Sequence, residues 1–232
     1  MSPLSRTQLE EAARWRLLSL LFERPSDGWR RQVQALAAEV SDDALREAAA
    51  AAIRQAAESA YCSLFGPGGP VPAREASCRP GIQLGYLLAE ITGIYQAFGY
   101  RPAAEESPDH IAVETGVVAY LKLKQIHAEC SGAAEEAQRC AEAAEYFLSR
   151  RLSLLAFAAR EALEKAGLPY LTLAARALCE RTGPPSAGDW FTTPCQDAGG
   201  SEEFTCGADG TAAEPSIPLI EIENHYGTVR PD

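Results

Sequence analysis

Apolar residues recur every three or four positions over most of residues 7–183, and this spacing leaves few folds open to the chain. The clearest stretch is residues 84–98, where the apolar positions are Leu84, Leu87, Leu88, Ile91, Ile94, Tyr95 and Phe98. Such spacing gathers the side chains on one side of an α-helix. No alternating run long enough for a β-strand precedes residue 215. We therefore predict an all-α fold, a single helical-bundle domain over residues 1–183.

Local signals divide this region into helices and one long loop. Thr7 and Glu10 have the spacing of a capping box, which predicts a helix start. Ser26 and Ser41 are suited to cap the next two helices, the second of which we expect to run to residue 65. The stretch 66–81 begins with GPGGPVP, and its glycines and prolines predict a loop.

The second half of the domain is predicted from the same signals. One helix is expected to start within residues 105–114 and to run to about Glu129. Residues 135–167 are expected to form one bent helix or two. The last helix is expected to end at Gly183, which follows the basic Arg181 and suits the position just after a helix end.

Charge and composition exclude several classes of function. The formal net charge of −11 argues against general nucleic-acid binding, which requires basic patches for phosphates. No apolar run approaches the roughly 20 residues of a membrane span, and the start of the chain lacks the basic and apolar regions of a signal peptide. We expect a cytoplasmic protein without stable membrane insertion. The cysteines are odd in number and scattered, which predicts reduced thiols.

Small residues form a second row beside the apolar stripe of 84–98. Gly85, Ala89, Gly93 and Ala97 recur every four residues. Because glycine inside a helix costs about 1 kcal/mol relative to alanine, the row predicts close approach by another backbone. That backbone is either a neighbouring helix of the same chain or a bound peptide.

The stretch EESPDHIAVE, residues 105–114, holds one of only three histidines in the chain. Ser107 is a good N-cap, Pro108 suits the first helical position, and Asp109 complements the helix dipole. Glu114 lies four residues after His110, at the predicted edge of the buried surface, where a carboxylate needs a partner. That partner is either His110, which makes the role structural, or a positive group on a ligand.

A metal- or thiol-dependent helical enzyme is the alternative from a different class. It would use Asp109, His110 and Glu114 together with the cysteines at 195 and 206. Three potential ligands within six residues lack a fourth group. No nucleophile elbow, phosphate loop or His-Glu-x-x-His motif accompanies them.

Two motifs resemble the TorD/DmsD/NarJ-type family of redox-enzyme maturation chaperones. The first is E-x-PDH-I-x-x-E after a helix ending in Y-x-x-FG, and its positions here are Glu106, Pro108, Asp109, His110, Ile111 and Glu114, preceded by Tyr95, Phe98 and Gly99. The second is Y-x-x-LF-x-GP with a proline-rich loop and Glu-x-Ser, and its positions are Tyr61, Leu64, Phe65, Gly66, Pro67, Glu75 and Ser77. Arg151 and Leu155 stand where the family often has His and Trp.

The resemblance implies an all-α chaperone of the TorD/DmsD type, with no cofactor and no catalytic site. Such chaperones bind the twin-arginine signal peptide, the apo form, or both, of a molybdopterin oxidoreductase catalytic subunit precursor, and assist cofactor insertion before export. Asp109 and Glu114 are the expected acceptors of the arginines, oriented by His110. The expected peptide-binding residues are Glu106, Pro108, Asp109, His110, Glu114, Tyr95, Tyr61 and Phe65.

Residues 184–232 differ in composition from the rest. They are rich in Gly, Pro, Ser and acids, which predicts a flexible acidic tail. Within it, residues 217–226 form a short apolar segment that docks on the body or on another chain, the latter giving a homodimer. Cys195 and Cys206 form a redox-sensitive pair in one alternative, and the tail has no partner at all in another.

Overall fold

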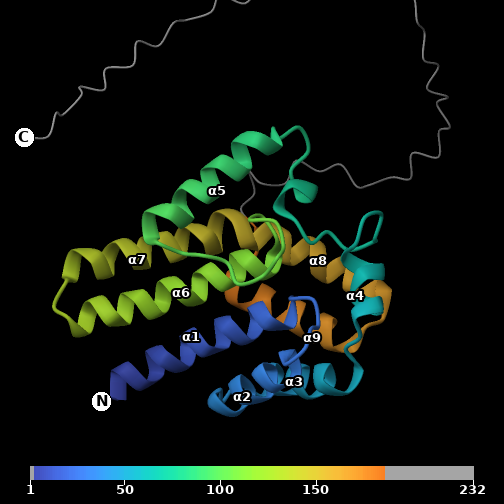
Figure 1. Cartoon of the computed structure of the whole chain (residues 1–232), viewed down its shortest axis with the longest axis horizontal. Coiled ribbons are helices and arrows are strands. Elements are labelled where there is room, and N and C mark those ends of the chain that lie inside the picture. The colour runs from blue at the N-terminus through green and yellow to red at the C-terminus, as the bar shows by residue number, and fades with distance from the viewer. Residues whose placement is uncertain (1–2, 186–232) are drawn as a thin grey trace, which may run out of the picture. The chain divides into compact units, whose positions relative to one another are not determined.

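The computed structural model describes the backbone of residues 3–185 and the side chains from residue 6 onward. It is all-α, as predicted, and the described residues contain no strand (Figure 1). The α-helices are α1 (Pro3–Leu21), α2 (Trp29–Glu39), α3 (Asp43–Gln55), α4 (Glu58–Phe65), α5 (Leu84–Phe98), α6 (Ile111–Cys130), α7 (Ala134–Phe147), α8 (Ser153–Ala166) and α9 (Pro169–Thr182). A 3₁₀ turn, η1 (Glu75–Cys78), and a π-helical turn, η2 (Leu148–Leu152), complete the order.

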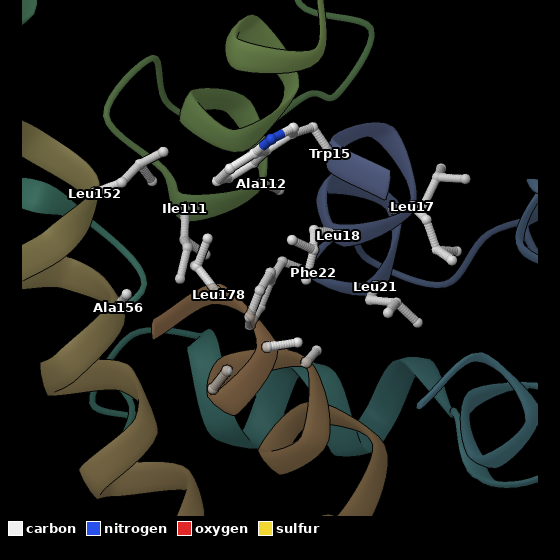
Figure 2. Close-up of a cluster of buried hydrophobic side chains, with 14 of the residues drawn as sticks. Trp15, Leu17, Leu18, Leu21, Phe22, Ile111, Ala112, Leu152, Ala156 and Leu178 are labelled. Carbon is white, nitrogen blue, oxygen red and sulfur yellow. The ribbon is translucent and has the colours of Figure 1, made fainter. Parts of the chain in front are cut away.

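The core is built around α1 and α6, which pack along each other (Figure 1). The first nine residues of α6, 111–119, are all buried, so this half of the helix is enclosed on every side. Trp15 of α1 lies beside Ala112 of α6, and Phe22, which directly follows α1, lies beside Leu178 of α9 (Figure 2). α7 packs on α6, while α3 and α8 pack on α9.

Two helix boundaries differ from the prediction in the first half. Residues 42–65 form two helices, because the chain becomes extended at Ala56 and Ala57. Arg30 stabilises this break by donating to the carbonyl oxygens of Ile53 and Ala56, which the interrupted helix leaves open. Ser41 does not cap α3; the side chain of Asp42 does, by accepting from the amide of Leu45 at 2.9 Å.

Other boundaries match or refine the prediction. Gly28, in a left-handed conformation, precedes α2 in place of the expected Ser26 cap. The predicted bend within residues 135–167 is the π-helical turn η2, which joins α7 to α8. α9 ends at Thr182, and Gly183 follows it with a φ of 70°, as expected of a residue that terminates a helix.

α5 is held by one row of side chains, because only Leu87, Ile91 and Tyr95 of this helix are buried. The row of small residues faces away from them and is exposed. A Cβ added to Gly85 or Gly93 would meet no atom within 4 Å. The prediction of a neighbouring helix on this row is therefore wrong for the part of the chain described, because α5 lies at the outside of the bundle (Figure 1).

Three further predictions concern the chain as a whole. Among the described helices, none has the length and apolar character needed to cross a membrane. The described cysteines carry free thiols, as expected: Cys62, Cys78, Cys130, Cys140 and Cys179. The tail predictions, including Cys195, Cys206 and the segment 217–226, lie outside the described residues.

Candidate functional site

The Ser-Pro-Asp-His stretch precedes α6 and is not its first turn. α6 begins at Ile111, and His110 is its N-cap, with Nδ1 accepting a hydrogen bond from the amide of Ala112 at 3.2 Å. The prediction that Ser107 caps the helix with Pro108 in its first position is therefore wrong. The histidine ring takes the capping role, which leaves the preceding residues free to make tertiary contacts.

Asp109 makes several of these contacts from a fully buried position. Its carboxylate accepts from Arg74 Nε at 2.9 Å, from Ser107 Oγ at 2.6 Å and from the amide of Ala76 at 3.3 Å. Its backbone carbonyl accepts from the amide of Glu75 at 2.9 Å. Asp109 thus ties the segment at residues 74–76 to the start of α6.

His110 is buried and connects, through Tyr61, the two segments that carry the motifs. Its Nε2 lies 3.3 Å from the hydroxyl of Tyr61, which donates to Oε1 of Glu106 at 3.3 Å. Burial lowers the pKa of His110 to about 4, with Arg74 adding to the shift and Asp109 opposing it. Because Nδ1 accepts from the backbone, the neutral ring carries its proton on Nε2 and donates it to Tyr61.

Aromatic contacts complete this side of the site. The rings of Tyr61 and Phe65 lie 4.9 Å apart, and Phe65 meets the ring of His110 edge-on at 6.2 Å. From α5, the buried Tyr95 donates its hydroxyl hydrogen to the carbonyl of Pro108 at 2.8 Å. The eight residues predicted for peptide binding therefore lie around one loop, although most of their side chains face inward.

A second set of charges lies behind this loop, centred on the buried Arg151 of η2. Its Nη1 donates to Glu75 at 2.7 Å, and its Nη2 forms an ion pair with Glu90 at 2.6 Å. Glu75 is buried as well and forms another ion pair, with Arg79, at 2.7 Å. The guanidinium group of Arg151 also lies over the ring of Tyr146, 5.3 Å from its centre.

Glu114 lies at the inner end of these charges and is completely buried. No N–H or hydroxyl donor among the described residues reaches its carboxyl oxygens. Burial raises the pKa of Glu114 well above its usual value, and the neighbouring carboxylate of Glu75 raises it further, while Arg151 opposes the shift. A protonated Glu114 can donate to Glu75, which satisfies both groups.

The positive and negative charges of the ion pairs around Glu114 are equal in number without counting Glu114. Arg74 pairs with Asp109, while Arg79 and Arg151 share Glu75 and Glu90. Three cations therefore face three anions, and these described ion pairs leave no cation to compensate a charge on Glu114. An ionised Glu114 would be an unpaired buried charge, which explains the direction of its pKa shift.

Three motif residues with an expected role in binding are engaged within the fold. The carboxyl groups of Asp109 and Glu114 are buried, and Asp109 holds Arg74. The two ring nitrogens of His110 are bonded to Tyr61 and to the backbone. Of the eight predicted residues, Glu106, Phe65 and Pro108 keep partial exposure.

The metal alternative also fails on geometry within the described residues. They contain no group of three His, Cys, Asp or Glu side chains placed to hold a metal ion. Both nitrogens of His110 are engaged, and Arg74 occupies the carboxylate of Asp109. The other groups of that hypothesis, Cys195 and Cys206, lie outside the described residues.

Sequence reasoning missed Arg74, Glu75 and Arg151 as parts of the site. Glu75 entered only as a motif match, and Arg151 only as a departure from the family pattern. The available signal was Arg151 itself, a charged residue that helical spacing places on the same side as Leu148 and Leu155. A buried arginine requires a buried acid, and the acid that meets it comes from a loop far away in the sequence.

Comparison with known proteins places this site inside a recognised region. A family model described as nitrate reductase delta subunit matches residues 26–159. The match covers more than half of the chain and includes every site residue described above, from Tyr61 to Arg151. No curated protein and no solved structure gives a significant match.

Proposed function

The chain belongs to the nitrate reductase delta subunit family, a family of molybdoenzyme assembly chaperones, and we propose that it is the cytoplasmic assembly chaperone of a molybdopterin-containing oxidoreductase subunit. It binds the signal peptide of the precursor, the apo form of the enzyme, or both, and holds the client until its cofactor is inserted. The membership agrees with the resemblance noted from the two motifs.

The observation that carries the proposed binding site is the half-buried carboxylate of Glu106 beside aromatic rings. Glu106 accepts from Tyr61, and Tyr61 packs against the half-buried Phe65. A carboxylate at the edge of an apolar surface suits a peptide that carries arginine next to apolar residues. We assign Glu106 as the acceptor for a client arginine and Phe65 as a contact for its apolar neighbour.

The buried motif residues support this surface from behind. Asp109 holds the loop to Arg74 and Ala76, while His110 holds Tyr61, which in turn holds Glu106. A binding group that is already fixed loses less conformational entropy when the ligand arrives. Asp109, His110 and Glu114 therefore act on the client through the shape of the site.

The exposed row of small residues on α5 is proposed to receive the apolar part of the client peptide. Of the two partners expected for this row, a neighbouring helix does not lie on it within the described residues. Gly85 and Gly93 have open space above them. Tyr95 connects α5 to the motif loop through Pro108. A helical or extended client segment could thus contact both the loop and α5.

Co-purification from the native host tests the proposal. The tagged full chain is compared with Glu106→Gln, Phe65→Ser and the control Glu105→Gln, an exposed acid next to the site. We expect wild type and Glu105→Gln to retain a molybdopterin oxidoreductase precursor, and Glu106→Gln to lose most of it. Equal retention by all four would remove the assigned binding residues, and absence of such a precursor from all would contradict the chaperone function.

A further inference from the structure

We propose that a hollow between α1, α6 and the segment 100–104 binds one apolar side chain of a peptide that carries an acidic residue next to it. The residues at the base and rim of this hollow include Ala112, Gly116, Ala119, Leu123 and Arg101. That the peptide belongs to the client rests on the proposed function. The chemistry of binding does not depend on which protein supplies the peptide.

The volume of the hollow indicates what it can hold. It measures about 240 Å³, whereas pockets for cofactors and other small ligands span roughly 300–1,000 Å³. One side chain of a larger molecule therefore suits the hollow better than a free ligand does. Leu123, an exposed leucine at its edge, offers apolar surface that the inserted side chain would remove from water.

The walls of the hollow are fixed by contacts within the fold. A Cβ on Gly116 would lie 2.6 Å from the hydroxyl of Tyr100, so the glycine lets this tyrosine lie directly against α6. The rings of Tyr100 and Tyr120 are 5.3 Å apart and tilted by 45°. Tyr120 is held in place because its hydroxyl donates to the carbonyl of Phe98 at 3.0 Å. Walls that are already ordered lose little conformational entropy when a side chain enters.

The charges around the hollow favour an acid in the peptide. Arg16 is already engaged, since it pairs with Glu23 at 2.6 Å and donates to Oγ of Ser19 at 2.8 Å. Arg101 is exposed and forms no ion pair with any of the residues that the structure describes. The lining residues thus include two cations and one anion, although the whole chain has a formal charge of −11. An acid of the peptide can pair with Arg101, whereas a basic residue there would be repelled.

The hollow lies close to the proposed acceptor of the client arginine. Ala104 lines the hollow, and Glu106 follows two residues later. Their Cα atoms are therefore at most about 7 Å apart. One peptide can reach both places, with its arginine on Glu106 and its acid on Arg101. Charges of opposite sign at the two places would fix the direction in which the peptide lies.

Short peptides test this chemistry on the full chain labelled with fluorotyrosine, without client. The readout is the fluorine NMR signals of Tyr100 and Tyr120, assigned with Tyr100→Phe and Tyr120→Phe. The first probe is acetyl-Gly-Asp-Phe-Gly-amide, and the other two carry Lys in place of Asp or Ser in place of Phe. The variant Arg101→Glu is compared with the matched control Arg31→Glu, which reverses the charge of an exposed arginine of α2 outside the hollow.

We expect the Asp-Phe probe to shift both signals with a Kd on the order of millimolar. The Lys-Phe probe should bind roughly threefold to tenfold more weakly, and the Asp-Ser probe should cause no shift. Arg101→Glu should remove the preference for Asp over Lys, and Arg31→Glu should retain it. Equal shifts with all three probes, no shift with Asp-Phe, or a preference that survives Arg101→Glu would each overturn the proposal. Because no client is present, these results are separate from those of the co-purification.

Discussion

Glu114 and Glu75 are neighbours in the interior, and both lie near the buried Arg151. The arginine bonds to Glu75 and balances its charge, while Glu114 is left to take a proton. The surroundings of the two residues thus differ, and burial together with the nearby Glu75 raises the pKa of Glu114. The first two predictions test this difference.

Glu114→Gln should preserve stability, because glutamine has the shape of the protonated acid. A raised pKa in the folded state means that folding takes up a proton above about pH 4.5, the unfolded value. The contribution of Glu114 to wild-type stability should therefore fall as pH rises from there toward the folded pKa, by up to about 1.4 kcal/mol per pH unit. The variant lacks this loss, so its advantage in urea unfolding should grow with pH. A pH-independent difference between the two proteins would refute a protonated Glu114.

Arg151→Met should destabilise the protein strongly, because it leaves Glu75 buried beside Glu114 with only Arg79 as a partner. Breaking a buried ion pair from one side typically costs about 3–5 kcal/mol. Adding Glu75→Gln to the same protein should recover part of the loss. Denaturant unfolding of both single variants and the double variant measures the coupling, and simple additivity would show that the two side chains do not interact.

At the level of helices, Gly116 and Gly93 differ in the space around them. A Cβ on Gly116 of α6 would lie 2.6 Å from the hydroxyl of Tyr100 and 3.0 Å from Oγ of Ser19. Ser19 belongs to α1 and donates to the carbonyl of Ala112, so Gly116 lies where α1 and α6 are in direct contact. Gly93 of α5 has open space instead.

Gly116→Val and Gly93→Ala should therefore change stability in opposite directions. Valine at 116 would force α1 and Tyr100 away, and overpacking of this kind costs roughly 1–3 kcal/mol. Alanine at 93 should add up to about 1 kcal/mol through helix propensity alone. Thermal and urea unfolding measure both effects. A destabilising Gly93→Ala would indicate that something already covers this part of α5.

For the whole molecule, the buried neutral histidine predicts how stability depends on acid. The pKa of His110 is lowered from its usual 6.5 to about 4, mainly by burial. Between these values the unfolded chain binds the proton and the folded chain does not, so the contribution of His110 to stability should fall as pH drops from 6.5 to 4. At about 1.36 kcal/mol per pKa unit, the loss amounts to roughly 3 kcal/mol.

His110→Asn offers the matched comparison, because asparagine is also a favourable N-cap. The variant should be less stable at pH 7, since it lacks the contact with Tyr61, yet its deficit relative to wild type should shrink as pH drops from 6.5 to 4. Urea unfolding across this range checks the prediction. If the difference in unfolding free energy between the two proteins stays the same across this range, then a group other than His110 titrates with the global unfolding.

The candidate site was only partly predictable, for a reason that particular residues make clear. The resemblance took Tyr61 and Phe65 from one motif and Glu106 and His110 from the other, and these four side chains lie together. It assigned arginine binding to Asp109 and Glu114, which the fold buries. Exposure depends on what packs over a residue, and that is decided by segments distant in the sequence.

The sequence by itself determined the helices, the long loop and the break at Gly183, because apolar spacing and capping residues act over a few positions. Family membership also followed from short motifs. Only the tertiary structure decided that His110 caps α6, that Arg151 meets Glu75, and that no cation of the described residues pairs with Glu114. These outcomes depend on burial and on charges brought together from η1, α6 and η2, and electrostatic energies are set by such distances and surroundings.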